Sequence, residues 1–402
     1  MNRITTWLLF GVLVAYTLWI GEYGYGGVPI VNRGITAILM ASLIIHLYSS
    51  HPPRIRVHPV YLCPLAMCAY GLIQTTFSSQ KIIYYGLDQS LYWYTVACIA
   101  YLAVHVLDER CAEQFRLGIA LLGGCEAVLS LLQQAVQTDK YFGLFPSRTT
   151  HVYGTFGYAN NFAQFIEMTL PVTLWQGIRK KEGQVPFLLL AALQVGAVVA
   201  SGSRGGTLLV SVELFVIMIV GWLRHRENLS GAAVALTFSL AAGSVYLSGF
   251  DRVVNKFRRP DQFADRHLLN AASIEMIRAR PISGWGLGTF PWIYKRFARY
   301  DDGTQIGRAH NDYLEWAAEG GIPYACIMFV LVGWTIWQAP RRVWAVGLVA
   351  INIHALADFP FARLGTAGWY FALTAMLFTS LAEQGNFSPE NQIDVKHLST
   401  IR

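Results

Sequence analysis

Charged residues are scarce in this sequence. They make up 14% of the 402 residues, whereas hydrophobic residues make up 54%. Because a soluble domain carries about 25% charged residues, this shortage argues against a soluble single core, and the hydrophobic share excludes a disordered chain. The mean hydropathy of +0.38 also argues against a soluble domain. The composition therefore predicts an integral membrane protein.

Cysteine is also scarce, and the spacings typical of metal ligands are missing. None of the six cysteines stands in a CxxC or Cys/His pattern, so we expect free thiols that pack as small hydrophobes, and no metal site. The basic residues are scattered and form no basic-aromatic stripe, which argues against nucleic acid as a partner. The net charge of +7 instead fits cytoplasmic loops that face anionic membrane lipid.

Apolar runs of membrane-spanning length recur along the chain. A spanning helix needs about 20 apolar residues, and we find about twelve such runs. The sequence thus predicts an all-α integral membrane protein, a single polytopic domain over residues 1–402 with about 12 transmembrane helices. The runs cover residues 5–20, 29–48, 58–77, 90–107, 116–137, 157–178, 186–200, 205–223, 231–249, 313–338, 341–357 and 363–382.

Lysine and arginine in the short loops set the orientation. If the N-terminus lies inside, the inner loops carry basic residues such as Arg54, Arg110 and Arg224, whereas the short outer loops carry almost none. Basic residues accumulate on the cytoplasmic side of membrane proteins. Both termini, including the polar tail 383–402, are therefore predicted to be cytoplasmic, and the first apolar run is taken as an uncleaved span.

Two outer segments, 138–156 and 250–309, carry more cations than the orientation requires. Long loops cross the membrane largely regardless of their charge, so these cations favour an anionic ligand on the outer face. Contact with lipid headgroups or lipopolysaccharide is the alternative.

The long outer loop 250–309 has internal structure. Its residues 265–280 predict an amphipathic helix with Asp265 as the N-cap and Pro281 as the stop. A glycine-rich turn and an aromatic-basic stretch follow, and the latter is typical of a segment in the membrane interface.

The first candidate for chemistry is Arg204, in the segment 201–206. An arginine near membrane depth is costly and therefore a functional hypothesis, and its planar guanidinium suits phosphate. The neighbouring glycines let backbone N–H groups approach a ligand. An arginine that extends to the interface is the alternative.

The second candidate is His310, just before the apolar run 313–338. We expect Asp312 and Glu315 to form a capping box there. The positive end of the helix would favour neutral His310, which can accept a proton near pH 7. The Gly320-Gly321 pair is expected to break this helix, so that His310 heads a short piece facing a cavity. A purely structural histidine is the alternative.

Further candidates lie on the same outer face. Arg266, at the start of the loop helix, is the third catalytic candidate, with a solvated loop charge as the alternative. His354 and Asp358 are noted as a weak supporting pair. Residues predicted to contact substrate are Arg308, Asn311, Arg148, His151 and Asn160. The predicted outer face thus combines arginines suited to phosphate, one histidine and aromatic residues. This combination favours an enzyme that transfers a group from a phosphorylated lipid donor without a metal.

These motifs resemble the O-antigen ligase / O-antigen polymerase superfamily. His310-Asn311, followed after nine residues by Gly321-Ile322-Pro323-Tyr324, looks like its periplasmic motif, and segment 201–206 is similar to its outer-face arginine motif. Other stretches that resemble the family are Asp265-Arg266, 280–288, 154–157 and 160–163.

The resemblance implies the all-helical (GT-C-like) membrane glycosyltransferase architecture, with 250–309 as the large periplasmic loop. It implies that Arg204 and Arg266 hold the pyrophosphate of an undecaprenyl-linked glycan and that His310 assists the acceptor hydroxyl as general base. No metal and no cofactor is implied. The active site would lie on the periplasmic face of the bacterial inner membrane.

The acceptor stays open within this class. A lipid A core acceptor makes an O-antigen ligase of lipopolysaccharide biosynthesis, which the family label favours. A growing glycan makes a polymerase, and a protein hydroxyl makes an O-oligosaccharyltransferase. Attack opposite the leaving diphosphate predicts inversion. A lipid-linked glycan flippase or transporter is the non-enzyme alternative, although such folds usually show paired halves and we find no convincing repeat.

Overall fold

The computed structural model describes residues 2–20, 36, 38–44, 55–77, 80–138, 140–141, 145–146, 151–179, 181–247, 258, 263–298, 306–382 and 392–393. These residues are almost entirely helical. Apart from one isolated bridge, the strands among them are two short antiparallel pairs, β1 (Ile55–Arg56) with β4 (Gln392–Ile393) and β2 (Lys140–Tyr141) with β3 (Phe145–Pro146). The all-α fold class predicted from the sequence is confirmed.

The long helices coincide with the predicted apolar runs. The run 29–48 and the tail 383–402 lie largely outside the described residues. The helices that match the other runs are α1 (Asn2–Ile20), α3 (Pro59–Thr76), α4 (Gln80–Val106), α5 (Glu109–Val136), α6 (Ala159–Ile178), α7 (Gln184–Ser201), α8 (Arg204–Arg224), α9 (Gly231–Leu247), α13 (Asp312–Gln338), α14 (Gly347–His354) and α15 (Leu364–Ala382).

Four helices in the described residues are long and apolar enough to cross a membrane. They are α5, α7, α8 and the stretch Asp312–Arg341, which extends α13 through the 3-10 helix η2 (Ala339–Arg341). Three shorter apolar helices are Arg3–Leu18, Gly231–Leu247 and Val343–His354, the last including the 3-10 helix η3 (Val343–Ala345). These helices support a multi-span membrane protein, while the number of twelve spans stays a prediction.

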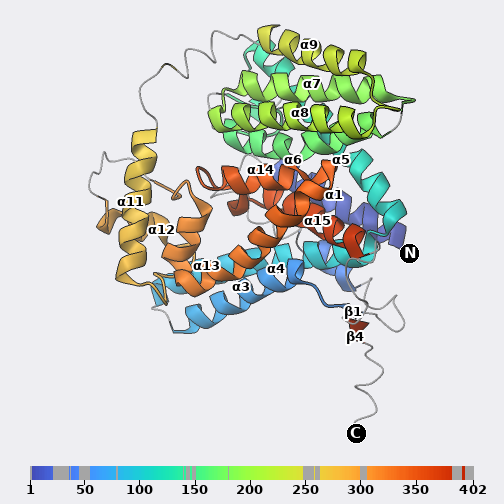
Figure 1. The fold of residues 1–402 in the computed structure, drawn as a ribbon. Coiled ribbons are helices and arrows are strands. Elements are labelled where there is room, and N and C mark those ends of the chain that lie inside the picture. Colours follow the sequence, from blue (N-terminus) through green and yellow to red (C-terminus); the bar gives the residue numbers. More distant parts are fainter. Residues whose placement is uncertain are drawn as a thin grey trace.

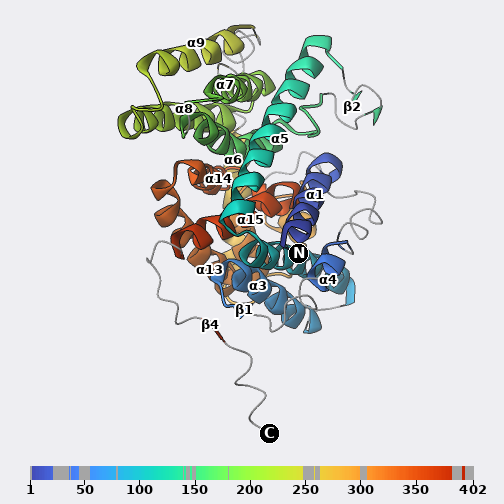
Figure 2. The ribbon, with the colours of Figure 1, turned by 90° about the vertical axis from the view of Figure 1, so that its right-hand side faces the viewer.

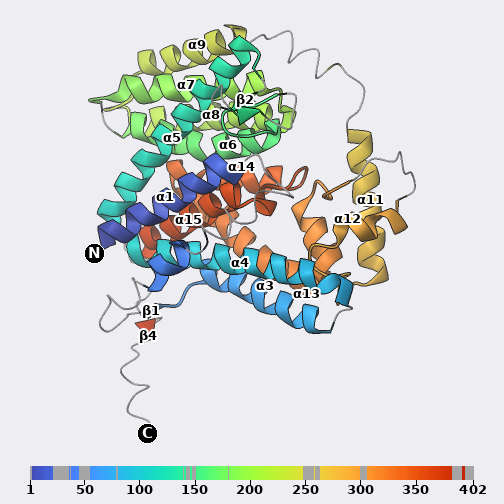
Figure 3. The same cartoon turned by 180° about the vertical axis from the view of Figure 1, so that it is seen from behind.

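The helices pack in two groups joined by α5 and α6. Helices α7, α8 and α9 lie on one side of the molecule, and α1, α3, α4, α13 and α15 lie on the other (Figure 1). The long helix α5 runs from one group to the other (Figure 2). Helices α11 (Phe263–Ala279) and α12 (Phe290–Ile293) lie at the end of the bundle remote from the N-terminus (Figure 3).

The predicted helix in the long loop is present as α11, with a different start. It begins at Phe263 rather than after Asp265, so Asp265 lies inside the helix and the predicted N-cap is wrong. Leu269, Ala272 and Met276 are buried, which confirms the amphipathic pattern. They pack against Phe290 of α12 and the adjoining 3-10 helix η1 (Tyr294–Arg296), so the aromatic-basic stretch is partly core, while Trp292 is exposed.

All six cysteines are free, as predicted. Cys68, Cys98 and Cys111 are buried, but Cys125 on α5 and Cys326 on α13 are exposed. The expectation of internal packing is therefore wrong for these two, because they lie on outward faces of candidate membrane-spanning helices rather than in the core.

Helix α13 bends sharply at Gly321, where the sequence predicted a break. Gly321 has φ +81 and ψ 170, so two helices meet there at a kink. The glycine-rich stretch 284–288 fits against the kink, because the Glu319 carboxylate accepts hydrogen bonds from the backbone of Gly288 (2.9 Å) and Phe290 (2.8 Å). From α3, Gln74 donates to the carbonyl of Glu319 (2.9 Å). The kink thus holds the segment between α11 and α12 onto the bundle.

We expect Gly321→Ala to destabilise the protein by about 2 kcal/mol or more, because an L-residue is strained at this φ and its Cβ would lie 2.1 Å from the Ile282 carbonyl oxygen. Thermal unfolding in detergent measures the effect. Gly333→Ala is the matched control on the same helix, since its Cβ would meet nothing within 4 Å and alanine favours a helix. Equal melting temperatures for the two variants would contradict the prediction.

Candidate functional site

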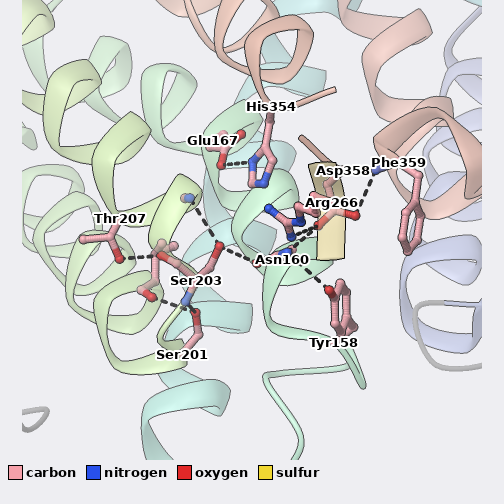
Figure 4. A network of polar contacts seen from close by, with 12 residues as sticks. Tyr158, Asn160, Glu167, Ser201, Ser203, Thr207, Arg266, His354, Asp358 and Phe359 are labelled. Carbon is pink, nitrogen blue, oxygen red and sulfur yellow. Dashed lines mark hydrogen bonds and ion pairs between the residues drawn. The ribbon is translucent and has the colours of Figure 1, made fainter. Parts of the chain in front are cut away.

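Asp358 lies at the centre of a polar cluster between α14 and the 3-10 helix η4 (Pro360–Ala362). Its side chain is fully buried. Its Oδ1 lies 3.3 Å from Nδ1 of His310. Its Oδ2 lies 3.7 Å from Nη2 of Arg266 (Figure 4). Two predicted catalytic residues from separate segments therefore meet at one carboxylate.

The surroundings keep the Asp358 carboxyl ionised. Burial by itself raises the pKa of an aspartate, but the hydrogen bond and charge of His310 and the charges of His354 and Arg266 outweigh it. The pKa of Asp358 therefore lies below its ordinary value of 3.8. At neutral pH this residue is therefore an anion, and the Arg266 guanidinium lies beside it.

The backbone presents His310 in an unusual way. His310 has φ +51, in the left-handed region, which a non-glycine residue adopts at a cost and which often marks a functional site. The ring packs edge-on against Phe359, with 4.9 Å between ring centroids, and 27% of the side chain is exposed. Because Nδ1 faces Asp358, the nitrogen left for a substrate is Nε2.

Helix α13 begins with a different cap from the one predicted. The N-cap is Asn311, whose side chain accepts from the backbone N–H of Leu314 (3.1 Å), so the capping box of Asp312 and Glu315 is wrong. Asn311 has the extended backbone that an N-cap needs, and Asp312 is the first helical residue.

The two acidic residues instead hold the segment before His310 and the segment after Asp358. Glu315 accepts hydrogen bonds from Arg308 (2.5 Å) and from the backbone of Ala309 (2.8 Å). Asp312 accepts from the backbone of Phe361 (2.9 Å). These contacts tie the segment before His310 and the segment after Asp358 to the same helix start.

The arginine motif is joined to the same cluster. Helix α7 ends at Ser201, and Gly202 follows as its C-cap in the left-handed conformation. The Ser203 side chain caps α8 by accepting from the N–H of Gly206 (3.2 Å). The hydroxyl of Ser203 donates to Oδ1 of Asn160 (2.7 Å), and the amide nitrogen of Asn160 donates to Asp358 (Figure 4). Hydrogen bonds thus connect Ser203 through Asn160 to Asp358. Half-buried Arg204, the first residue of α8, is the next residue in the sequence after Ser203.

The other residues predicted to contact substrate do not form one group in the structure. Arg308 forms an ion pair with Glu315, and the Asn311 side chain donates to the carbonyl of Leu356 (3.0 Å) besides capping α13. His151 is exposed, and Arg148 lies outside the described residues. Their roles in binding substrate stay predictions.

The structure corrects the expected pairing of His354 with Asp358. His354 Nδ1 lies 2.7 Å from Oε1 of Glu167 on α6, while Asp358 pairs with His310 and Arg266. Glu167 was absent from the sequence-based candidates. A carboxylate within an apolar run is itself a signal of function, and it marks Glu167 together with residues such as Glu126 and Glu213.

The side chains of the polar cluster determine which chemistry it can carry out. No group of three or more His, Cys, Asp or Glu residues that could hold a metal ion occurs in the described part of the chain. What the cluster offers is an imidazole oriented by a carboxylate, a nearby guanidinium and a glycine-rich helix start. This set can accept a proton at one point and stabilise anionic charge at another.

Residues 189–325 match the family model described as Wzy_C: O-antigen ligase. No curated protein and no solved structure matches the chain. The matched segment contains Arg204, Arg266 and His310 but ends before Asp358. The resemblance to the O-antigen ligase / O-antigen polymerase superfamily that the motifs predicted is thereby confirmed, and it indicates a function of the ligase or polymerase type.

Proposed function

We propose that this protein transfers a preassembled glycan from undecaprenyl pyrophosphate to an acceptor hydroxyl at the periplasmic face of the inner membrane, with the lipid A core as acceptor. The observation that carries the proposal is the convergence of His310 and Arg266 on Asp358, together with the hydrogen-bond chain from Asp358 to the start of α8. The family match over residues 189–325 supports the same class of reaction.

In this reaction His310 acts as the general base. Asp358 holds the imidazole by Nδ1, so that Nε2 takes the proton of the acceptor hydroxyl as its oxygen attacks the anomeric carbon. The bond between that carbon and the phosphate oxygen breaks with its electron pair on the diphosphate. Attack from the side opposite the leaving group gives an inverted product.

The two arginines counter the charge on the leaving group. When the glycosyl bond breaks, the diphosphate gains one negative charge. Fixed guanidinium groups stabilise such charge without reorganising during the reaction, and planar donors match phosphate oxygens. In this mechanism Arg204 and Arg266 stabilise the charge of the leaving diphosphate, and no metal ion takes part.

Arg204→Ala is expected to abolish transfer while the protein still inserts into the membrane, because the diphosphate loses a bidentate cationic partner. The measurement is glycan transfer by purified protein in proteoliposomes that contain the labelled lipid-linked donor and the lipid A core acceptor. Arg278→Ala is the control, since this arginine on α11 is 70% exposed. Near-normal transfer by Arg204→Ala would remove the mechanism.

The same assay separates the competing functions. An inverted glycosidic bond to lipid A core supports the ligase, elongation of the donor glycan supports a polymerase, and glycan on a protein hydroxyl supports an O-oligosaccharyltransferase. Movement of label across the bilayer without a new bond overturns the enzyme in favour of a flippase. A product that keeps the stereochemistry of the donor overturns the single-displacement mechanism.

A further inference from the structure

A second histidine lies buried behind the start of α8. His354 is the last residue of α14, and its side chain is 3% exposed. Its Nδ1 lies 2.7 Å from Oε1 of Glu167, which is fully buried on α6 (Figure 4). A pair of ionisable groups inside a membrane-spanning bundle is costly and marks a functional site by default.

The free edge of this imidazole faces the arginine motif. The three atoms nearest to the place where a Gly205 Cβ would stand all belong to His354, with Nε2 at 3.4 Å. Gly205 itself is exposed. Nε2 has no hydrogen-bond partner in the part of the chain that the structure describes. An unpartnered imidazole nitrogen therefore borders the space beside an accessible glycine.

The same helical turn is built to receive an anion. Gly205 is the second residue of α8, and the first N–H groups of a helix have no acceptor within it. The helix dipole adds positive charge at this end, where phosphate commonly binds. Arg204 lies one residue earlier. His354 Nε2 thus borders a turn that carries the Arg204 guanidinium and the N–H groups of Arg204 and Gly205, while the N–H of Gly206 donates to Ser203.

We propose that His354 donates a hydrogen bond from Nε2 to the donor diphosphate, a contact that rests on the proposed function of this site. Glu167 is a positioning residue, because it accepts from Nδ1–H and its negative charge favours a proton on Nε2. As the bond to the anomeric carbon breaks, its electron pair becomes negative charge on the diphosphate, which the His354 hydrogen bond stabilises. The acceptor proton still goes to His310, so His354 needs to lose no proton.

Gly205→Ala tests the contact without disturbing the fold. The new Cβ would lie in ordinary contact with Nε2, and alanine is favourable in a helix, but the methyl group covers the imidazole edge. We expect the dissociation constant for inorganic pyrophosphate, measured with the protein in nanodiscs, to rise about ten- to a hundredfold, which is the range for one hydrogen bond to a charged group.

Substitutions of His354 test the same bond from the other side. His354→Leu removes the donor and should weaken pyrophosphate binding as much as Gly205→Ala does. His354→Gln keeps an N–H group and should restore part of the affinity. Glu167→Gln should fall between wild type and His354→Leu, because it keeps an acceptor for Nδ1 but loses the charge. A purely structural role for His354 predicts no such order among folded variants.

The controls separate failure of this inference from failure of the proposed function. Gly11→Ala on α1 is the matched glycine control, because its Cβ would meet nothing within 4 Å. If Arg204→Ala weakens pyrophosphate binding while Gly205→Ala does not, the role of His354 is overturned and the proposed function stands. If Arg204→Ala also binds like wild type, the diphosphate site and the proposed function both fail. Gly205→Ala tests the role of His354 even if the His354→Leu variant does not fold.

Discussion

Replacing His310 by glycine is expected to abolish glycan transfer while the protein remains folded. The imidazole is the base of the proposed reaction, and loss of a general base costs about 10²- to 10⁴-fold in rate. Glycine is the informative replacement because His310 has φ +51, a conformation that glycine adopts freely. His310→Ala keeps the left-handed strain without the imidazole, so we expect it to be less stable than His310→Gly by about 1 kcal/mol.

Two measurements on the same preparations test this expectation. Transfer is followed in proteoliposomes, and thermal unfolding is followed in detergent. His267→Ala is the matched control, because this exposed histidine lies on α11 beside Arg266 and its loss should leave transfer unchanged. If His310→Gly transfers glycan at a rate within a few-fold of wild type, His310 is not the base. If His310→Gly melts below His310→Ala, the account of its backbone is wrong.

The positions of most helices could be predicted because membrane spans depend on local composition. A run such as 205–223 is apolar enough to define α8 by itself, and α8 extends over Arg204–Arg224. The kink at Gly321 was also predictable, because Gly320-Gly321 followed by Pro323 is a local signal. Cap residues were harder. Asn311 and Asp312 are both good N-caps, so the sequence does not distinguish them, and the structure has Asn311 as the cap.

The centre of the site could not be predicted in the same way, because its contacts depend on tertiary packing. Asp358 follows α14, far along the chain from Arg266. It meets His310 because the backbone N–H of Asp312 donates to the carbonyl of Ala355 (3.1 Å), which fixes the start of α13 against the end of α14. No local pattern carries that information. Arg204, Arg266 and His310 were recognisable by chemical type, whereas Asp358 was noted only as a weak supporting residue beside His354, and its contacts with Arg266 and His310 were not predicted.

Asp358→Asn is expected to lower transfer by up to about 10⁴-fold, the loss found when the carboxylate that orients a catalytic histidine becomes an amide. Asparagine has the same shape, but it cannot hold Nδ1–H of His310 as an anion does and it leaves Arg266 without its buried partner. The loss should appear in kcat, because the imidazole is wrongly oriented, and in KM, because Arg266 is no longer held for the diphosphate. Glu275→Gln, an exposed carboxylate on α11, is the matched control.

The pH dependence of stability tests the charge of Asp358 independently of transfer. Because the pKa of Asp358 in the folded protein lies below the ordinary value of 3.8, its ionisation stabilises the fold fully above that value. This contribution disappears as the pH falls through the lowered pKa. The difference in unfolding free energy between wild type and Asp358→Asn should therefore be constant from about pH 5 to 8 and shrink below about pH 4. A difference that grows on acidification would show that Asp358 is protonated in the native state, and the orientation of His310 by a carboxylate would then have to be abandoned.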